Sequence, residues 1–205
     1  MIPFLESIEL RGGGVPFVLR SAREAPHAPW WETGPGPVRP ALNPTAGIAA
    51  VLHKHALMSP WLDRATGWCW ERIERLRTAN PYELRVVLSF LDFVPDRERA
   101  RRALERLRPK LLRRGIVETD PRVRGDVFGP LDVAPEPDRL SRTLFSDEMI
   151  GAHLDALERR QLKDGGWDVH FPIWTPITRF DWRGIQTVES LKILRQNGRM
   201  GSPPP

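Results

Sequence analysis

The sequence predicts an all-α protein, and three observations carry that prediction. Six segments place apolar residues at helical spacing. Each of these segments follows a polar residue that can cap a helix. No segment shows the strict alternation of apolar and polar residues that is typical of a strand. The connections in the middle of the chain are only a few residues long, so consecutive helices are expected to be antiparallel neighbours.

The first three helices are each expected to begin at a polar residue followed by proline. Proline is tolerated at the first helical position, where its missing N–H would be unpaired in any case. Asn43-Pro44 opens a helix that is expected to run to about Leu57. Ser59-Pro60 and Asn80-Pro81 open the next two. The third shows a full apolar stripe, formed by Leu84, Val87, Leu88 and Leu91.

The last three helices are expected to be capped by Asp96, Ser146 and Asp181. The first of them carries many Arg and Lys residues between Arg97 and Arg114, which we interpret as a solvated outer face. The last is expected to end at Asn197-Gly198 and to point Thr187, Val188, Leu191 and Leu194 inward.

Two long connections, 12–42 and 115–145, are rich in Pro and Gly and separate the helices. Loops of this length in a compact domain are usually functional or replace a missing element. The residues 1–200 are predicted to form one domain, and the tail 201–205 is predicted to be disordered.

Composition narrows the class of protein but not its partner. The net charge is +5 and the pI is about 10.1, which suits nucleic acid, an anionic membrane or a diphosphate ligand about equally. No run approaches the roughly 18 apolar residues of a membrane helix, and the N-terminus does not resemble a signal peptide, so we expect a cytoplasmic protein. The single cysteine, Cys69, excludes an intramolecular disulfide and is interpreted as a packed core residue.

An internal repeat is the most informative feature of the sequence. The segment Leu157–Trp167 aligns with Leu5–Val15, and Leu, Glu, Leu and two glycines coincide in the two segments. In both copies an amphipathic helix ends on a glycine turn and is followed by a long loop and another helix. Positive φ angles carry no steric cost at such glycines. The repeated unit covers 5–57 and 157–198.

The second copy contains Gln161, Asp164, Gly165, Gly166 and Trp167 in the order Gln-x-x-Asp-Gly-Gly-Trp. We expect Trp167 to stack on the amide of Gln161. This motif resembles the QW motif of squalene–hopene and oxidosqualene cyclases, and it is similar to the Gln-x-x-Asp-Gly-Gly-Phe repeats of protein prenyltransferase β subunits. The resemblance implies an α/α-toroid, which is a ring of inner and outer helices.

On this resemblance the inner helices begin near Pro44, Pro81 and Trp182, and the outer ones near Pro60, Arg97 and Asp147. An irregular segment at 115–145 is expected to replace one inner helix, because it contains several prolines. Upstream repeats are expected to be missing, so that the flanks of the helices at 44–57 and 182–196 lack neighbours. These flanks carry Ile48, Val51, Val188 and Leu191. Burying this apolar surface is favourable, so we expect the incomplete ring to self-associate through the edge that the missing repeats leave open.

The hallmark catalytic residues of the related enzymes are absent from this sequence. There is no Asp-x-Asp-Asp acid, no Asp-Asp-x-x-Asp magnesium motif and no recognisable zinc ligand set around Cys69. The acidic residues Asp132 and Glu136–Asp138 do not match the Asp-x-Asp-Asp motif, and we interpret them as ordinary loop carboxylates. His153 is interpreted as a satisfied core histidine. The sequence therefore predicts no metal and no cofactor, and its catalytic residues are unknown.

The resemblance places a hydrophobic cavity at the loop after each glycine turn and at the first turn of the inner helix. Aromatic residues there can line an isoprenoid site and stabilise cations through their π faces. The alternative is that the tryptophans only pack the loops onto the helices and that Asp181 is only a cap. The residues implied as substrate-binding are Trp30, Trp31, His170, Trp174, Arg179, Asp181, Trp182 and Arg183.

Three functions remain open at this level. The first is a toroid protein that binds or transforms a hydrophobic, isoprenoid-type substrate. The second is a catalytically inactive helical-repeat protein that binds a partner, which the missing catalytic residues favour. The third, nucleic-acid binding, rests on charge alone and is disfavoured because no aromatic residue is interleaved with the basic face.

Overall fold

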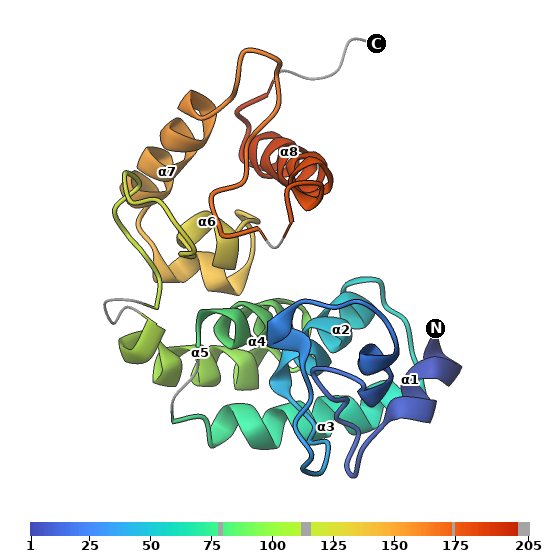
Figure 1. The fold of residues 1–205 in the computed structure, drawn as a ribbon. Helices are drawn as coiled ribbons and strands as arrows, with labels where there is room; N and C mark the ends of the chain where they lie inside the picture. Colours follow the sequence, from blue (N-terminus) through green and yellow to red (C-terminus); the bar gives the residue numbers. More distant parts are fainter. Residues whose placement is uncertain (78–79, 112–115, 174, 201–205) are drawn as a thin grey trace. The chain divides into compact units, whose positions relative to one another are not determined.

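The computed structural model describes residues 1–77, 80–111, 116–173 and 175–200, and this part of the chain is all-helical (Figure 1). It contains α-helices, short 3-10 helices and a single isolated bridge between Pro16 and Pro40, but no strand. The all-α prediction is confirmed. The chain divides into two compact units, Met1–Leu107 and Arg108–Pro205, and each unit holds one copy of the repeat. The assignment of 1–200 to one domain stays a prediction.

In its described residues the first unit contains four complete α-helices, most of a fifth that continues to Leu111, and two short 3-10 helices at Arg20–Glu24 and Pro29–Trp31. Three predicted helix starts are confirmed. The side chains of Ser59, Asn80 and Asp96 accept hydrogen bonds from backbone N–H groups three residues later, at 3.1, 2.9 and 3.0 Å. The helices are α1 (Ile2–Ile8), α2 (Leu42–Lys54), α3 (Pro60–Glu74), α4 (Pro81–Phe93) and α5 (Arg97–Leu111).

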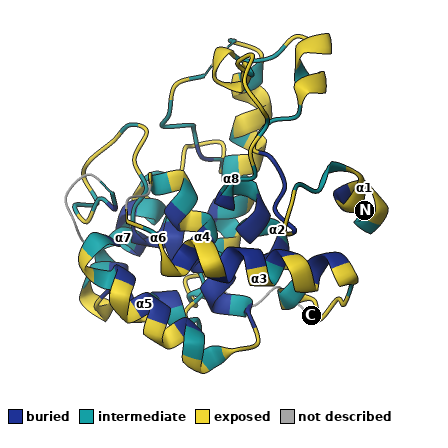
Figure 2. Cartoon of the chain, turned by 90° about the horizontal axis from the view of Figure 1, so that it is seen from below, coloured by how far each residue is buried: buried dark blue, intermediate teal, exposed yellow. Residues whose placement is uncertain are grey.

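The helix α2 spans Leu42–Lys54, but Asn43 has extended backbone angles, with φ −94 and ψ 111, so its continuous part begins at Pro44, as predicted. It ends at Lys54, short of Leu57. It packs against α3 and, most extensively, against α4. Small residues on α2 (Ala46, Ala49 and Ala50) are fully buried, and they let the backbone of α4 approach closely. The predicted apolar stripe of α4 supplies the opposite side of this core. Figure 2 shows the buried faces of α3 and α4 as bands along each helix.

Several arginines of the basic face of α5 make hydrogen bonds and ion pairs within the protein. Arg97 donates to the carbonyls of Leu91 and Val94, at 2.7 and 3.1 Å, and therefore binds the end of α4. Arg106 donates to the Ile73 carbonyl at 3.1 Å, and Arg99 pairs with a glutamate of α3 at 2.7 Å. These guanidinium groups fasten helix ends, which fits the outer-face interpretation of the basic run up to Leu111. The last two arginines of that run lie outside the described residues.

The second unit contains α6 (Pro130–Val133), a 3-10 helix (Leu140–Leu144), α7 (Asp147–Arg159) and α8 (Thr178–Gln196). Helix α7 packs against both α6 and α8. Ser146 caps α7 by accepting from the Met149 N–H at 3.2 Å, as predicted. The described part of 115–145 holds only the four-residue α6 and the 3-10 helix, so the expected absence of a long helix is confirmed there.

Two predictions about α8 are wrong. Asp181 is not its cap, because the helix begins at Thr178 and the preceding Ile177 already has helical angles, with φ −68 and ψ −36. Val188 does not point inward but is 56% exposed, whereas Ser190 and Leu194 are buried. The reason is that α8 carries apolar residues on two opposite faces, so that periodicity alone does not identify the buried one.

Within the described residues, no helix combines the length and the apolar character needed to cross a bilayer. The tail 201–205, which was predicted to be disordered, lies outside the described residues.

Cys69 is buried on α3, as predicted, and this burial raises the pKa of its thiol to about 12. We expect the native protein to resist a thiol-reactive disulfide reagent at pH 8, because both access and thiolate are lacking. The reaction should become complete in guanidinium chloride. Absorbance of the released thiolate measures both rates. Fast labelling without denaturant would contradict the packing of α3.

Candidate ligand-binding site

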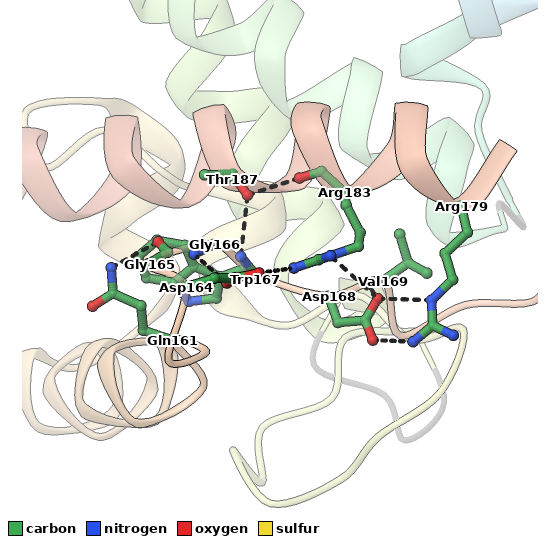
Figure 3. Close-up of polar contacts among 10 residues, drawn as sticks. All are labelled: Gln161, Asp164, Gly165, Gly166, Trp167, Asp168, Val169, Arg179, Arg183 and Thr187. Carbon is green, nitrogen blue, oxygen red and sulfur yellow. Dashed lines mark hydrogen bonds and ion pairs between the residues drawn. The ribbon is translucent and has the colours of Figure 1, made fainter. Parts of the chain in front are cut away.

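The glycine turn of the second copy is a hydrogen-bonded loop at the end of α7 (Figure 3). The N–H of Leu162 donates to the Gly166 carbonyl at 2.8 Å, and the N–H of Gly165 donates to the Leu162 carbonyl at 2.9 Å. Gly165 has a φ of +84°, a conformation in which a side chain would be strained. The side chains of Gln161 and Asp164 bond the carbonyl of Gly165 and the N–H of Gly166, at 2.8 and 3.1 Å. Each motif residue therefore contributes to the turn itself.

Trp167 follows the turn and joins α7 to α8. Its side chain is only 3% exposed, and its indole N–H donates to the Leu157 carbonyl at 2.8 Å. Its backbone N–H donates to the hydroxyl of Thr187 on α8 at 3.1 Å, and that hydroxyl donates in turn to the Arg183 carbonyl at 2.8 Å. The stacking of Trp167 on Gln161 stays a prediction. The polar contacts of Trp167 are instead to the two helices.

The first copy repeats the two backbone hydrogen bonds of this turn and the bond from the following residue to a threonine hydroxyl. The N–H of Leu10 donates to the Gly14 carbonyl at 2.8 Å, and the N–H of Gly13 donates to the Leu10 carbonyl at 3.1 Å. Gly13 has a φ of +102°, and a Cβ there would lie 2.5 Å from backbone atoms of α3. Val15, 1% exposed, takes the place of Trp167, and its N–H donates to the hydroxyl of Thr45 at 2.9 Å. The repeat seen in the sequence is thus a repeat of structure.

The two arginines that were predicted to bind substrate, Arg179 and Arg183, form ion pairs within the protein (Figure 3). Arg183 pairs with Asp164 at 2.8 Å, and the Nε atom of Arg179 bonds Oδ1 of Asp168 at 3.2 Å. Hydrogen bonds from Arg179 and Arg183 lower the pKa of Asp168 and of Asp164, respectively. The two arginines therefore fasten the start of α8 to the turn. Asp181 lies exposed in the first turn of α8.

The predicted aromatic residues fall into separate places. Trp30 and Trp31 form a short 3-10 helix and are 59% and 48% exposed. Trp182 packs edge-on against Phe171, with ring centroids 5.2 Å apart, and Phe171 packs similarly against His170. The ring of His170 also bonds the Gly125 carbonyl at 2.8 Å. Trp174 lies outside the described residues. Phe171 is a partner that the sequence reasoning missed.

A small polar cavity of about 50 Å³ lies in the second unit. His153 and His170 line it together with acidic and arginine side chains. His153 is bonded to the Thr119 carbonyl at 3.0 Å, so it is a satisfied histidine, but it is half-buried and not part of the core as predicted. One water occupies about 30 Å³ in the liquid, so this cavity is too small for an isoprenoid. Among the described residues, no three His, Cys, Asp or Glu side chains are arranged to hold a metal.

A larger and almost wholly apolar groove of about 290 Å³ runs along α2 in the first unit. Its floor consists of α2 residues spaced by three and four positions, and Val86 of α4 forms one wall. Gly47 keeps the groove open, because a Cβ at this position would lie 3.2 Å from Val86. The sequence reasoning did not identify this groove, although the regular spacing of its α2 residues indicates an apolar face. We call it the α2 groove; its lining is Met1, Asn43, Pro44, Gly47, Ile48, Val51, Leu52 and Val86.

Comparison with known proteins found no matching family, no similar curated protein and no similar solved structure.

Removal of Trp167 tests its structural role. Trp167→Ala should destabilise the protein by about 3 kcal/mol, the scale for truncation of a large buried aromatic residue. Chemical denaturation measures this loss. Trp30→Ala is the matched control, because Trp30 is largely exposed and its loss should change the free energy of unfolding little. Equal midpoints for both variants would refute the assigned role of Trp167.

The two threonines provide a second test. Thr45→Val and Thr187→Val keep the side-chain shape but leave the N–H of Val15 or Trp167 without its acceptor. Each should lower the free energy of unfolding by about 1–2 kcal/mol, the cost of an unsatisfied buried donor. Amide hydrogen exchange at residue 15 or 167 should accelerate in the corresponding variant alone. Unchanged exchange at both amides would show that the hydroxyls are not their acceptors.

Proposed function

We propose that this chain is a toroid-type helical-repeat protein, similar in build to terpene cyclases and prenyltransferases, that binds a hydrophobic isoprenoid-type ligand in the α2 groove. The observation that carries the proposal is the groove's apolar lining at the start of α2. The resemblance makes α2 an inner helix, and it places the hydrophobic cavity at the first turns of the inner helices. Pro44, Gly47 and Ile48 occupy those turns.

Size and chemistry both support this choice of ligand. Pockets for small molecules usually measure about 300–1,000 Å³, and the α2 groove lies at the lower end of that scale. The lining offers hardly any polar atoms, so a long hydrocarbon chain fits it better than a nucleotide or a sugar. Each methylene removed from water there contributes about 0.8 kcal/mol.

The toroid arrangement forms part of the proposal and has two supports. The first is the repeated glycine turn, with the same backbone hydrogen bonds in both copies. The second is the packing of α2 against both α3 and α4. The connections from α2 to α3 and from α3 to α4 are short, so consecutive helices are antiparallel neighbours. In the proposed toroid, α2 and α4 are then neighbouring inner helices, and α3 is an outer one.

The second candidate function is that of a helical-repeat protein without catalysis that binds a partner. Arg179 and Arg183, the cations available to a diphosphate near the second glycine turn, are already paired with Asp168 and Asp164. The exposed apolar side chains of α8 also favour this candidate, because scattered apolar residues become a docking surface when they line up on one face.

Ligand binding is tested with a dansyl-labelled C15 isoprenoid alcohol, whose fluorescence rises in an apolar site. Val51→Asp should weaken binding at least tenfold, because the ligand would have to desolvate a carboxylate. Leu57→Asp is the matched control, since Leu57 is also half exposed, lies near the end of α2 and does not line the groove. The control should bind like the parent. Equal affinity of both variants, or no binding at 100 μM, would reject the α2 groove as the site.

A further inference from the structure

The face of α8 that points away from its own unit carries an ordered stripe of four exposed residues. We call this stripe the α8 seam and define it as Asp181, Ile185, Val188 and Lys192. Ile185 and Val188 are 50% and 56% exposed, and the Lys192 side chain is 56% exposed and pairs with Glu189 of the same helix at 3.0 Å. The spacing of four, three and four residues keeps all of them on one side of a helix. This is the spacing of a coiled-coil contact line.

The opposite side of α8 faces the core of the second unit. Thr187 bonds Trp167 there, and Ser190 and Leu194 are buried. Each helical residue turns by about 100°, which places these residues roughly across the helix axis from the seam. The apolar residues of the seam are thus not a by-product of core packing. They form a second apolar line on the same helix.

Helix α2, which follows the glycine turn in the first unit, can be compared with α8, which follows it in the second. In α2, the residue after the threonine that accepts from Val15 is Ala46, which is fully buried in a helix that packs against α3 and α4. In α8, the residue after the corresponding threonine is Val188, and it is exposed. The same structural position is therefore covered by a helix in one copy of the repeat and open in the other.

We propose that a second copy of this chain covers the α8 seam through the same seam, with the two α8 helices antiparallel about a two-fold axis. The order of residues supports this occupant, because the spacing reads the same in both directions. An antiparallel pair centred between Ile185 and Val188 places Ile185 against the partner's Val188. The same pairing places Asp181 against the partner's Lys192. Each apolar residue then meets an apolar residue, and each charge meets its opposite.

The charge order also selects the direction of pairing. A parallel pair would place Asp181 beside the partner's Asp181 and Lys192 beside the partner's Lys192, and like charges at such positions are unfavourable. Gly184 borders the seam, and no atom lies within 4 Å of the place where its Cβ would be. The absence of a side chain there lets the second helix approach closely. The interface goes beyond the ligand-binding proposal and does not depend on it.

One pair of helices buries less surface than a standard interface, so the dimer should be weak. Sedimentation equilibrium of the full chain between 5 and 500 μM should show a reversible monomer–dimer equilibrium. Ile185→Glu should raise the dissociation constant at least a hundredfold, because it places two carboxylates in the apolar centre. Far-UV circular dichroism should be unchanged, since Ile185 is half exposed. Val51→Asp, which changes the α2 groove, should dimerise like the parent.

A charge swap identifies the register. Asp181→Lys or Lys192→Asp alone turns two attractive contacts into two repulsive ones and should raise the dissociation constant about tenfold. The double variant Asp181→Lys with Lys192→Asp restores opposite charges and should return the dissociation constant to within about threefold of the parent. A parent that is monomeric at 500 μM overturns the proposal. So does a double variant that dimerises no better than the single ones, because a different surface must then pair.

The two proposals fail separately. Ile185 does not line the α2 groove, so Ile185→Glu should bind the isoprenoid probe as the parent does. If the probe fails to bind any variant while the charge swap behaves as expected, the ligand proposal is rejected and the seam stands. The reverse result rejects the seam alone.

Discussion

A single hydrogen bond, made twice, organises both units of this protein. In each copy the chain leaves a glycine turn and buries the next residue, and the backbone N–H of that residue then needs an acceptor. The hydroxyl of a threonine on the following long helix supplies it, through Thr45 for Val15 and through Thr187 for Trp167. An unpaired buried N–H costs about 1–3 kcal/mol. The bond therefore turns the face of α2 with Thr45 toward Val15 and the face of α8 with Thr187 toward Trp167.

The two helices are used differently although they are anchored in the same way. Helix α2 is covered by α4 along its small residues, and what remains open is the α2 groove. Helix α8 is held by Arg179 and Arg183 at its start and leaves the seam uncovered. Charged residues near the glycine turn thus serve the attachment of α8.

Local chemistry made most helix borders predictable. Ser59, Asn80, Asp96 and Ser146 each bond an N–H three residues ahead, a contact decided within a few residues of sequence. The same rule failed at Asp181, because the helix already begins at Thr178 and Ile177 before it has helical angles. The candidate site was less predictable. Arg183 and Arg179 do bond Asp164 and Asp168 at and just after the second glycine turn. The partners of His170 and Trp182, Gly125 and Phe171, come from loops whose course the sequence does not reveal.

By itself, the sequence determined the all-α class, the repeated glycine turn and the buried faces of α3, α4 and α5, since each depends on spacing or on contacts within a few residues. Only the tertiary structure decided which face of α8 is buried, where the α2 groove lies and which charges are already paired. The physical reason is that these features depend on contacts between residues far apart in the chain. The two threonine bonds show this well. The turns align in sequence, but the loops that lead to Thr45 and Thr187 differ in length, so only folding brings each hydroxyl to its N–H.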